Sequence, residues 1–382
     1  MNESERAYLN AALGMAVLPR SPRANFRSLT LPDGRAYLLP VGARRAFANA
    51  LTLYQTHRVT TRLIHSLMSA GARLGWSQRL LPVEDLGGAD AWNDFFAGLF
   101  QRGKTELAIS LGTPGPQRKP VIQILSSGGD TLGYAKVGWN EITARLVQRE
   151  ADALETVTAC AKTFAAPHVI FAGQWRKTYL CVQSAPATRA YPAATQLNRD
   201  FVRAVSALSL LDRHAPRLEE TRVWKSLEAR LERSQADEPR LLLQQAERVI
   251  QKRRFGNTLP VHFAHGDFTP WNAARLRSGL YLYDWESFAP DRPAGYDLFH
   301  FLIRVHSLVK KSSPPKMLSA ILNAMQREPA AQYWKNLDLQ FEPEFLLLYL
   351  VERLVSPPQE SDAPDELRLS LRLLELCLAG MQ

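Results

Sequence analysis

Short apolar runs separated by turn residues dominate the middle of the chain, and this pattern predicts β-strands. The predicted strands cover residues 107–111, 121–125, 132–137 and 178–183. Between the third and the fourth, residues 143–158 carry apolar side chains at helical spacing, namely Leu146, Val147, Ala151, Leu154 and Val157. This part of the sequence is therefore expected to form an antiparallel sheet with one long helix.

The second half of the chain has a different period, typical of amphipathic helices. Helices are predicted at residues 196–211, 219–233, 239–252, 297–310, 316–327, 343–354 and 366–379. Three short strands interrupt them, at residues 259–264, 273–276 and 280–283. The last two are separated by Ser278-Gly279, so they are expected to form a hairpin.

Polar residues with a definite spacing surround this hairpin. His265-Gly266-Asp267 follows the first short strand, Asn272 precedes the hairpin, and Asp284-Trp285-Glu286 follows it. A hairpin at this point folds Asp284 back beside Asn272. Carboxylate and amide oxygens are ligands that suit Mg²⁺, so the segment indicates a site for chemistry on phosphate groups.

The spacing His265-Gly266-Asp267 with Asn272 and a later Asp284 resembles the aminoglycoside phosphotransferase and choline kinase branch of the protein-kinase-like fold. The resemblance implies that Asp267 is the catalytic base, that Asn272 and Asp284 hold Mg²⁺, and that ATP is the phosphate donor. A protein kinase usually has arginine in place of Gly266. That arginine contacts an activation-loop phosphate, so its absence argues against regulation of this kind.

The same resemblance gives roles to residues upstream. Lys136, in the predicted strand 132–137, matches the phosphate-binding lysine, and Glu150 on the following helix is its expected partner. Gly112 begins a loop in the position of a nucleotide-covering loop, although the loop lacks a complete G-x-G-x-x-G pattern. The predicted strand 178–183 leads into the expected hinge near Ser184, where backbone groups would contact adenine.

Three further residues have supporting or open roles. His265 and Asp297 are expected to brace the catalytic loop, Asp297 from the start of a helix, rather than to take part in the chemistry. Glu286 is equally compatible with a place at the metal or acceptor and with a solvated surface.

The resemblance implies an α+β, bilobal, protein-kinase-like fold, and the length agrees with it. The chain has 382 residues, of which 46% are hydrophobic and 22% charged, enough for more than one compact domain. We expect a basic N-terminal extension over residues 1–85, a β-rich N-lobe over residues 86–184, and a mainly helical C-lobe over residues 185–382. The extension is predicted to contain a hairpin of residues 26–31 and 35–39, and helices at residues 44–54 and 59–74.

The formal net charge of +10 is not explained by the motif. Between residues 1 and 80 the basic positions are all arginines, and the acidic positions are only Glu3, Glu5 and Asp33. Three interpretations remain open: a solvated basic face, a surface for an anionic partner or membrane, and a nucleic-acid patch. Nucleic acid ranks last, because no nucleic-acid module is recognisable.

The three cysteines and the absence of a long apolar run indicate a reduced, cytoplasmic protein without a transmembrane segment. No His-Glu-x-x-His, paired Cys-x-x-Cys or Gly-x-Ser-x-Gly occurs, so the sequence lacks the motifs of zinc hydrolases, zinc ribbons and nucleophile-elbow enzymes.

We expect an ATP- and Mg²⁺-dependent phosphotransferase acting on the hydroxyl of a small molecule, such as a sugar, aminoglycoside or amino alcohol. The alternative is a catalytically silent, nucleotide-binding scaffold that docks through the basic extension. The sequence leaves open the acceptor, the choice between ATP and GTP, and the oligomeric state.

Overall fold

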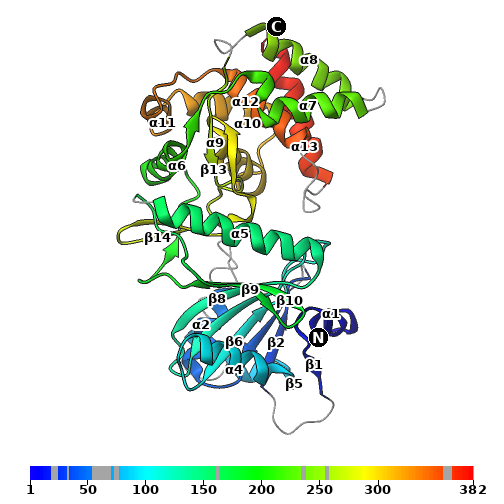
Figure 1. The fold of residues 1–382 in the computed structure, drawn as a ribbon, viewed down its shortest axis with the longest axis vertical. Coiled ribbons are helices and arrows are strands. Elements are labelled where there is room, and N and C mark those ends of the chain that lie inside the picture. The colour runs from blue at the N-terminus through cyan, green and yellow to red at the C-terminus, as the bar shows by residue number, and fades with distance from the viewer. Residues whose placement is uncertain are drawn as a thin grey trace. The chain divides into compact units, whose positions relative to one another are not determined.

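The computed structural model describes residues 1–18, 25–31, 34–53, 70–72, 77–160, 163–233, 238–253, 258–355 and 364–381. The chain forms two compact units (Figure 1). Unit 1 contains Met1–Glu155 and Pro167–Ala187, and unit 2 contains Thr156–Ala166 and Thr188–Gln382. Within the described ranges, none of the helices combines the length and the apolar character that crossing a membrane requires.

Unit 1 is built on an eight-stranded antiparallel sheet with the order β4-β2-β3-β6-β7-β8-β10-β9. In that order the strands are Val83–Glu84, Phe26–Thr30, Ala36–Pro40, Thr105–Ser110, Val121–Ser126, Thr131–Gly138, Thr178–Ser184 and Val169–Trp175. A separate pair joins β1 (Ala16–Val17) to β5 (Leu86–Gly87). The predicted antiparallel sheet is confirmed.

Helices lie against both faces of this sheet. On one face, α1 (Glu3–Leu13) and α4 (Ala89–Leu99) bury Leu9, Trp92 and Phe96 against Leu38 and Ile109. On the other face, α2 (Arg44–Ala50) contributes to a second cluster, followed by the 3₁₀ turn Leu51–Leu53. A sheet buried on both sides needs nearly continuous apolar strands, and all five residues of β3 are buried.

Most of the long helix α5 (Glu141–Cys160) belongs to unit 1 and covers the same face as α2. Val147 and Ala151 of α5 pack against the buried, free Cys181 of β10. Burial raises the pKa of the Cys181 thiol to about 12, so this cysteine is protonated and unreactive at neutral pH. Cys181 is paired in register with Lys136 on β8, so Lys136 lies on the face that α5 covers.

The described part of the N-terminal extension joins unit 1. The predicted hairpin is present as β2 and β3, with Thr30 opposite Ala36, and β3 then pairs with β6. The expected boundary near residue 85 therefore falls inside one sheet, because strand pairs between distant segments are not visible in local sequence patterns. The predicted helix 59–74 lies outside the described residues apart from residues 70–72.

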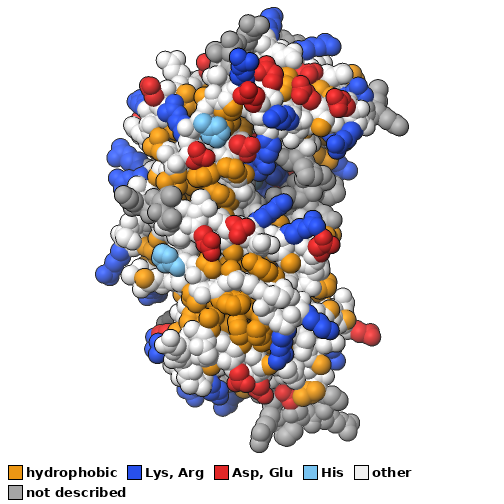
Figure 2. Space-filling view, in the orientation of Figure 1, with side chains coloured by type: hydrophobic (Ala, Val, Ile, Leu, Met, Phe, Trp, Pro, Cys, Tyr) orange, Lys and Arg blue, Asp and Glu red, His pale blue; other side chains and the backbone are white. Residues whose placement is uncertain are grey.

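Several arginines of residues 1–80 contact groups of unit 1 itself. Arg27 donates to the carbonyl oxygen of Leu81 at 2.8 Å, and Arg45 forms an ion pair with Asp130. On the face in Figure 2, Lys and Arg side chains are scattered among acidic ones rather than gathered in one patch. The described residues give no support to a dedicated surface for an anionic partner.

Unit 2 is mainly helical, as predicted. Its helices are α6 (Arg199–Leu211), α7 (Arg222–Arg233), α8 (Glu238–Arg253), α9 (Tyr296–Arg304), α10 (Pro314–Met325), α11 (Ala330–Asn336), α12 (Pro343–Val355) and α13 (Pro364–Ala379). The short sheets have the orders β11-β14-β15 and β12-β13-β16. Their strands are Tyr191–Pro192, Ala273–Leu276, Gly279–Leu282, Arg213–His214, Val261–Ala264 and Ala289–Pro293. The described residues therefore have the expected α+β class.

A buried hydrogen-bond network fixes β13 within unit 2. The hydroxyl of Tyr333 on α11 lies 2.8 Å from Nε2 of His262 and accepts from the backbone N–H of Gly295 at 2.9 Å. Nδ1 of His262 lies 2.8 Å from the carbonyl oxygen of Phe263. Burial lowers the pKa of His262 to about 4. A neutral ring that donates from Nδ1 and accepts at Nε2 satisfies all of these contacts.

This network predicts acid destabilisation. An unfolded histidine binds a proton below pH 6.5, whereas folded His262 remains neutral down to about pH 4. The unfolded state therefore binds more protons in this window, and stability should fall as the pH decreases from 6.5 to 4, by at most about 3 kcal/mol from this residue. Melting temperatures measured from pH 4.5 to 8 should show the fall. The dependence should be shallower in His262→Gln, and an unchanged slope in that variant would contradict the assignment.

Candidate functional site

The segment after β13 forms a closed loop that ends in the β14-β15 hairpin. The side-chain amide of Asn272 donates to the backbone oxygen of Asp267 at 2.9 Å and to its Oδ2 at 2.8 Å. The N–H of Tyr283, directly after β15, donates to the carbonyl oxygen of Asn272 at 3.1 Å. These contacts bring the backbone before Asp284 against Asn272, as the predicted hairpin requires.

Asp297, at the start of α9, holds the other side of the loop. Its two carboxylate oxygens accept from the backbone N–H groups of His265 at 2.8 Å and Gly266 at 3.0 Å. Burial raises the pKa of Asp297 to about 6, against the opposing effect of these two donors. The contacts fix consecutive peptide groups of the loop to a helix end.

Gly266 is the one residue of the loop at which a side chain cannot be placed. Its φ is +84°, and a Cβ atom would lie 2.0 Å from the carbonyl oxygen of Ser287. A larger residue would therefore displace the backbone that donates to Asp297. The same geometry excludes the arginine that a protein kinase has at this position.

We expect Gly266→Ala to lower the free energy of unfolding by about 2 kcal/mol or more, from the left-handed backbone and the steric overlap together. Gly14→Ala is the matched control, because Gly14 also has a positive φ, +62°, but nothing lies within 4 Å of its Cβ position. Denaturant unfolding compares the two variants. Equal losses would show that the approach of Ser287 costs nothing.

His265 and Phe268 pack the loop into unit 2. The buried ring of His265 lies 4.4 Å from that of Trp285, and its Nε2 is 3.1 Å from the carbonyl oxygen of Tyr283. Burial lowers the pKa of His265 to about 4, so the ring is neutral and donates to this oxygen. Phe268 is buried against Phe201 of α6 and Phe301 of α9. Because His265 and Phe268 are both held by this packing, the backbone of Asp267, which lies between them in the sequence, is fixed in position.

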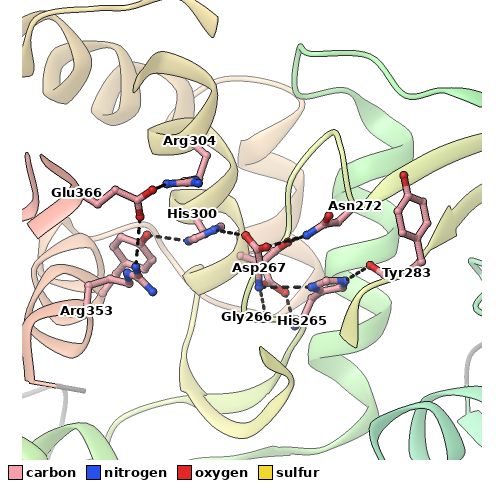
Figure 3. Close-up of polar contacts among 11 residues, drawn as sticks. His265, Gly266, Asp267, Asn272, Tyr283, His300, Arg304, Arg353 and Glu366 are labelled. Carbon is pink, nitrogen blue, oxygen red and sulfur yellow. Dashed lines mark hydrogen bonds and ion pairs between the residues drawn. The ribbon is translucent and has the colours of Figure 1, made fainter. Parts of the chain in front are cut away.

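The carboxylate of Asp267 is held by donors on both oxygens. His300 Nε2 lies 2.8 Å from Oδ1, and Asn272 donates to Oδ2 (Figure 3). Burial acts to raise the pKa of Asp267, but the hydrogen bond from His300 opposes this effect, and the pKa lies below its usual value. The side chain is 36% exposed. Asp267 is therefore a charged carboxylate that other molecules can approach.

Asp284 and Glu286 supply further oxygens near this loop. Asp284 has φ +70° and ψ +59°, an uncommon backbone conformation for a residue with a side chain. Ligand oxygens of Asp284 and Glu286 lie within 4.8 Å of one another. Asn272 uses its amide nitrogen on Asp267, which leaves its Oδ1 as the atom for a ligand. This set of hard oxygen donors fits Mg²⁺.

In unit 1, Lys136 and Glu150 form a buried ion pair. The Nζ atom of Lys136 lies 2.6 Å from the Glu150 carboxylate, and the side chains are 11% and 0% exposed. Gln183 of β10 also donates to Glu150, at 3.0 Å. The ammonium group of Lys136 is thus fixed by its ion pair with α5, and the lysine side chain keeps a small exposed surface.

The other two residues singled out in unit 1 are placed by backbone contacts. Gly112 follows β6 with φ +77°, and its Cβ position would lie 2.7 Å from the carbonyl oxygen of Lys119. This close approach shapes the loop from residue 112 to 119. Ser184 and His168 exchange two hydrogen bonds of 2.9 Å, which close the end of β10.

The sequence interpretation missed His300, Tyr349 and Gln183 as neighbours of the singled-out residues. A signal for His300 was available, because it follows Asp297 by three residues in a predicted helix and so lies on the same helix face. Tyr349 and Gln183 belong to distant segments of their units, and no local spacing connects them to Asp267 or Glu150.

No protein-family model and no curated protein matches the sequence. Solved structures are similar, among them a thermostable mutant of aminoglycoside phosphotransferase APH(4)-Ia, 13% identical over 75% of this chain and 98% of that one, with a TM-score of 0.47. Amicoumacin kinase hAmiN in complex with AMP-PNP, Ca²⁺ and Ami is 13% identical over 69% of this chain and 86% of that one, with a TM-score of 0.40. Aminoglycoside phosphotransferase APH(3'')-Id from Streptomyces rimosus in complex with ADP and streptomycin is 12% identical over 62% of this chain and 90% of that one, with a TM-score of 0.41.

Proposed function

We propose that this protein is a small-molecule kinase, which transfers the γ-phosphoryl group of ATP to a hydroxyl of a sugar, aminoglycoside or amino alcohol. The observation that carries the proposal is Asp267, a charged and partly exposed carboxylate held through both oxygens by His300 and Asn272. A base that must orient a hydroxyl needs this combination of charge, fixed direction and access.

In the proposed step, the acceptor oxygen forms a bond to the γ-phosphorus while the bond from phosphorus to the β–γ bridging oxygen breaks. Asp267 accepts a hydrogen bond from the acceptor hydroxyl, aligns its oxygen and takes its proton. ADP leaves with the bridging oxygen. Because such transfers depend mainly on positioning and charge stabilisation, the fixed direction of Asp267 matters more than its strength as a base.

Two sets of residues would neutralise the negative charge of the phosphates. Asn272, Asp284 and Glu286 would hold Mg²⁺, which supplies neutralisation of phosphate charge when it is bound. Lys136 is directed by Glu150 and offers an ammonium group to the phosphates. The buried pair keeps this ammonium in one position and so reduces the cost of ordering it.

The test is phosphate transfer from γ-labelled ATP, and separately GTP, with Mg²⁺, to a panel of sugars, amino alcohols, aminoglycosides and cell-extract metabolites. A labelled product that is lost in Asp267→Asn would support the proposal and give the acceptor class. Nucleotide binding without transfer to any acceptor would favour the alternative of a silent nucleotide-binding scaffold.

A further inference from the structure

A buried histidine outside the sequence motif contacts the proposed base. His300 lies on α9, one turn after Asp297, and is 4% exposed. Its Nε2 is 2.8 Å from Oδ1 of Asp267 (Figure 3). Its Nδ1 is 3.0 Å from the hydroxyl of Tyr349 on α12. The ring therefore connects the catalytic loop to a helix that is distant in sequence.

The direction of these hydrogen bonds follows from their chemistry. A carboxylate only accepts, so Nε2 of His300 must carry a proton. Burial lowers the pKa of His300 and outweighs the opposing effect of Asp267, and the charges of Arg353 and Arg304 add to the lowering, so the ring is neutral and its Nδ1 is an acceptor. Burial also raises the pKa of Tyr349. Its hydroxyl therefore stays protonated and donates a hydrogen bond to Nδ1 of His300. The result is a chain of donors from Tyr349 through His300 to Asp267.

A second layer fixes the helices that carry this chain. Arg304 is one turn beyond His300, and Arg353 is one turn beyond Tyr349. Both arginines form ion pairs with the carboxylate of Glu366 on α13. In the Arg353 pair, a guanidinium nitrogen lies 3.8 Å from Oε2 of Glu366. Figure 3 shows Glu366 between them. Because the i and i+4 residues of a helix share a face, this ion-pair layer sets the spacing of α9 and α12 at His300 and Tyr349.

We propose that His300 is a positioning residue for phosphoryl transfer, which fixes the rotation of the Asp267 carboxylate, and that Tyr349 selects its tautomer. The inference rests on the proposed function of Asp267. Asn272 holds one carboxylate oxygen from within the loop, but a single contact leaves the group free to turn about it. The second contact, from α9, removes that freedom, so the remaining lone pairs point in one direction.

The kinetic test compares His300→Gln with His300→Leu. A glutamine amide can donate from nearly the position of Nε2, whereas leucine fills a similar volume without a donor. We expect kcat to fall about 100-fold in His300→Leu, with the KM for ATP unchanged, and to recover to within about tenfold of wild type in His300→Gln. Tyr349→Phe should lose less than His300→Leu, because the contact between His300 and Asp267 remains possible.

The inference is overturned if His300→Leu, folded by circular dichroism, keeps wild-type kcat, or if His300→Gln is as impaired as His300→Leu. A second measurement needs no acceptor: long-range ¹H–¹⁵N NMR of the imidazole in the wild-type protein. Protonation at Nε2 supports the arrangement and protonation at Nδ1 overturns it, even if no acceptor is found. Absence of transfer to any acceptor would instead count against the proposed function.

Discussion

Asp267→Asn is expected to reduce phosphoryl transfer by about 10³-fold, within the range for loss of a general base. The substitution keeps the size of the side chain but removes its charge and its ability to take a proton. It also disturbs the hydrogen bonds, because both Asp267 oxygens accept, from His300 and from Asn272. An amide has one oxygen, so its NH₂ group must face one of these two donors in either orientation.

Labelled transfer and isothermal titration calorimetry with ATP separate chemistry from binding in this variant. We expect the affinity for ATP to change little, because Asp267 acts on the acceptor in the proposed step. Asp212→Asn is a control for the same chemical change at a side chain that is 46% exposed and outside the loop. Wild-type turnover in Asp267→Asn would exclude Asp267 as the base.

The geometry of the loop from His265 to Asn272 could be anticipated, because residues close together in the sequence determine it. Apolar runs on either side of Ser278-Gly279 specify a hairpin, and the observed register places Leu276 opposite Gly279. Once the hairpin forms, Tyr283 lies against Asn272, so Asp284 returns toward the loop. Residues within about twenty positions of one another, joined by a tight turn, are positioned by backbone geometry that a sequence pattern reveals.

Contacts between distant segments could not be anticipated in the same way. The sheet of unit 1 includes β2 and β3 because β3 pairs with β6, through Leu38 opposite Ile109, across an intervening segment of about sixty residues. An apolar strand such as β3 shows that both of its faces are buried, but not which strand is its neighbour. Tyr349 is likewise ordinary in its helix, and only tertiary packing brings it to His300.

Lys136→Met should both destabilise the protein and stop phosphoryl transfer. Glu150 is fully buried, and without the ammonium group the neutral amide of Gln183 is the donor that its charge keeps among the hydrogen bonds of the described residues. Removing one partner of a buried ion pair costs about 3–5 kcal/mol. Thermal unfolding measures the stability term, and labelled transfer measures the catalytic one. Lys177→Met, an exposed lysine at the β9-β10 turn, should change neither.

The double variant Lys136→Met with Glu150→Leu separates the two roles of the lysine. It removes the unpaired negative charge of Glu150 and replaces it with an apolar side chain. Most of the lost stability should therefore return, as it can when a buried ion pair is replaced by apolar residues. Transfer should remain absent, because nothing replaces the ammonium group that we assign to the phosphates. Recovery of turnover together with stability would mean that Lys136 acts only through the structure of unit 1, and the phosphate-binding role would have to be withdrawn.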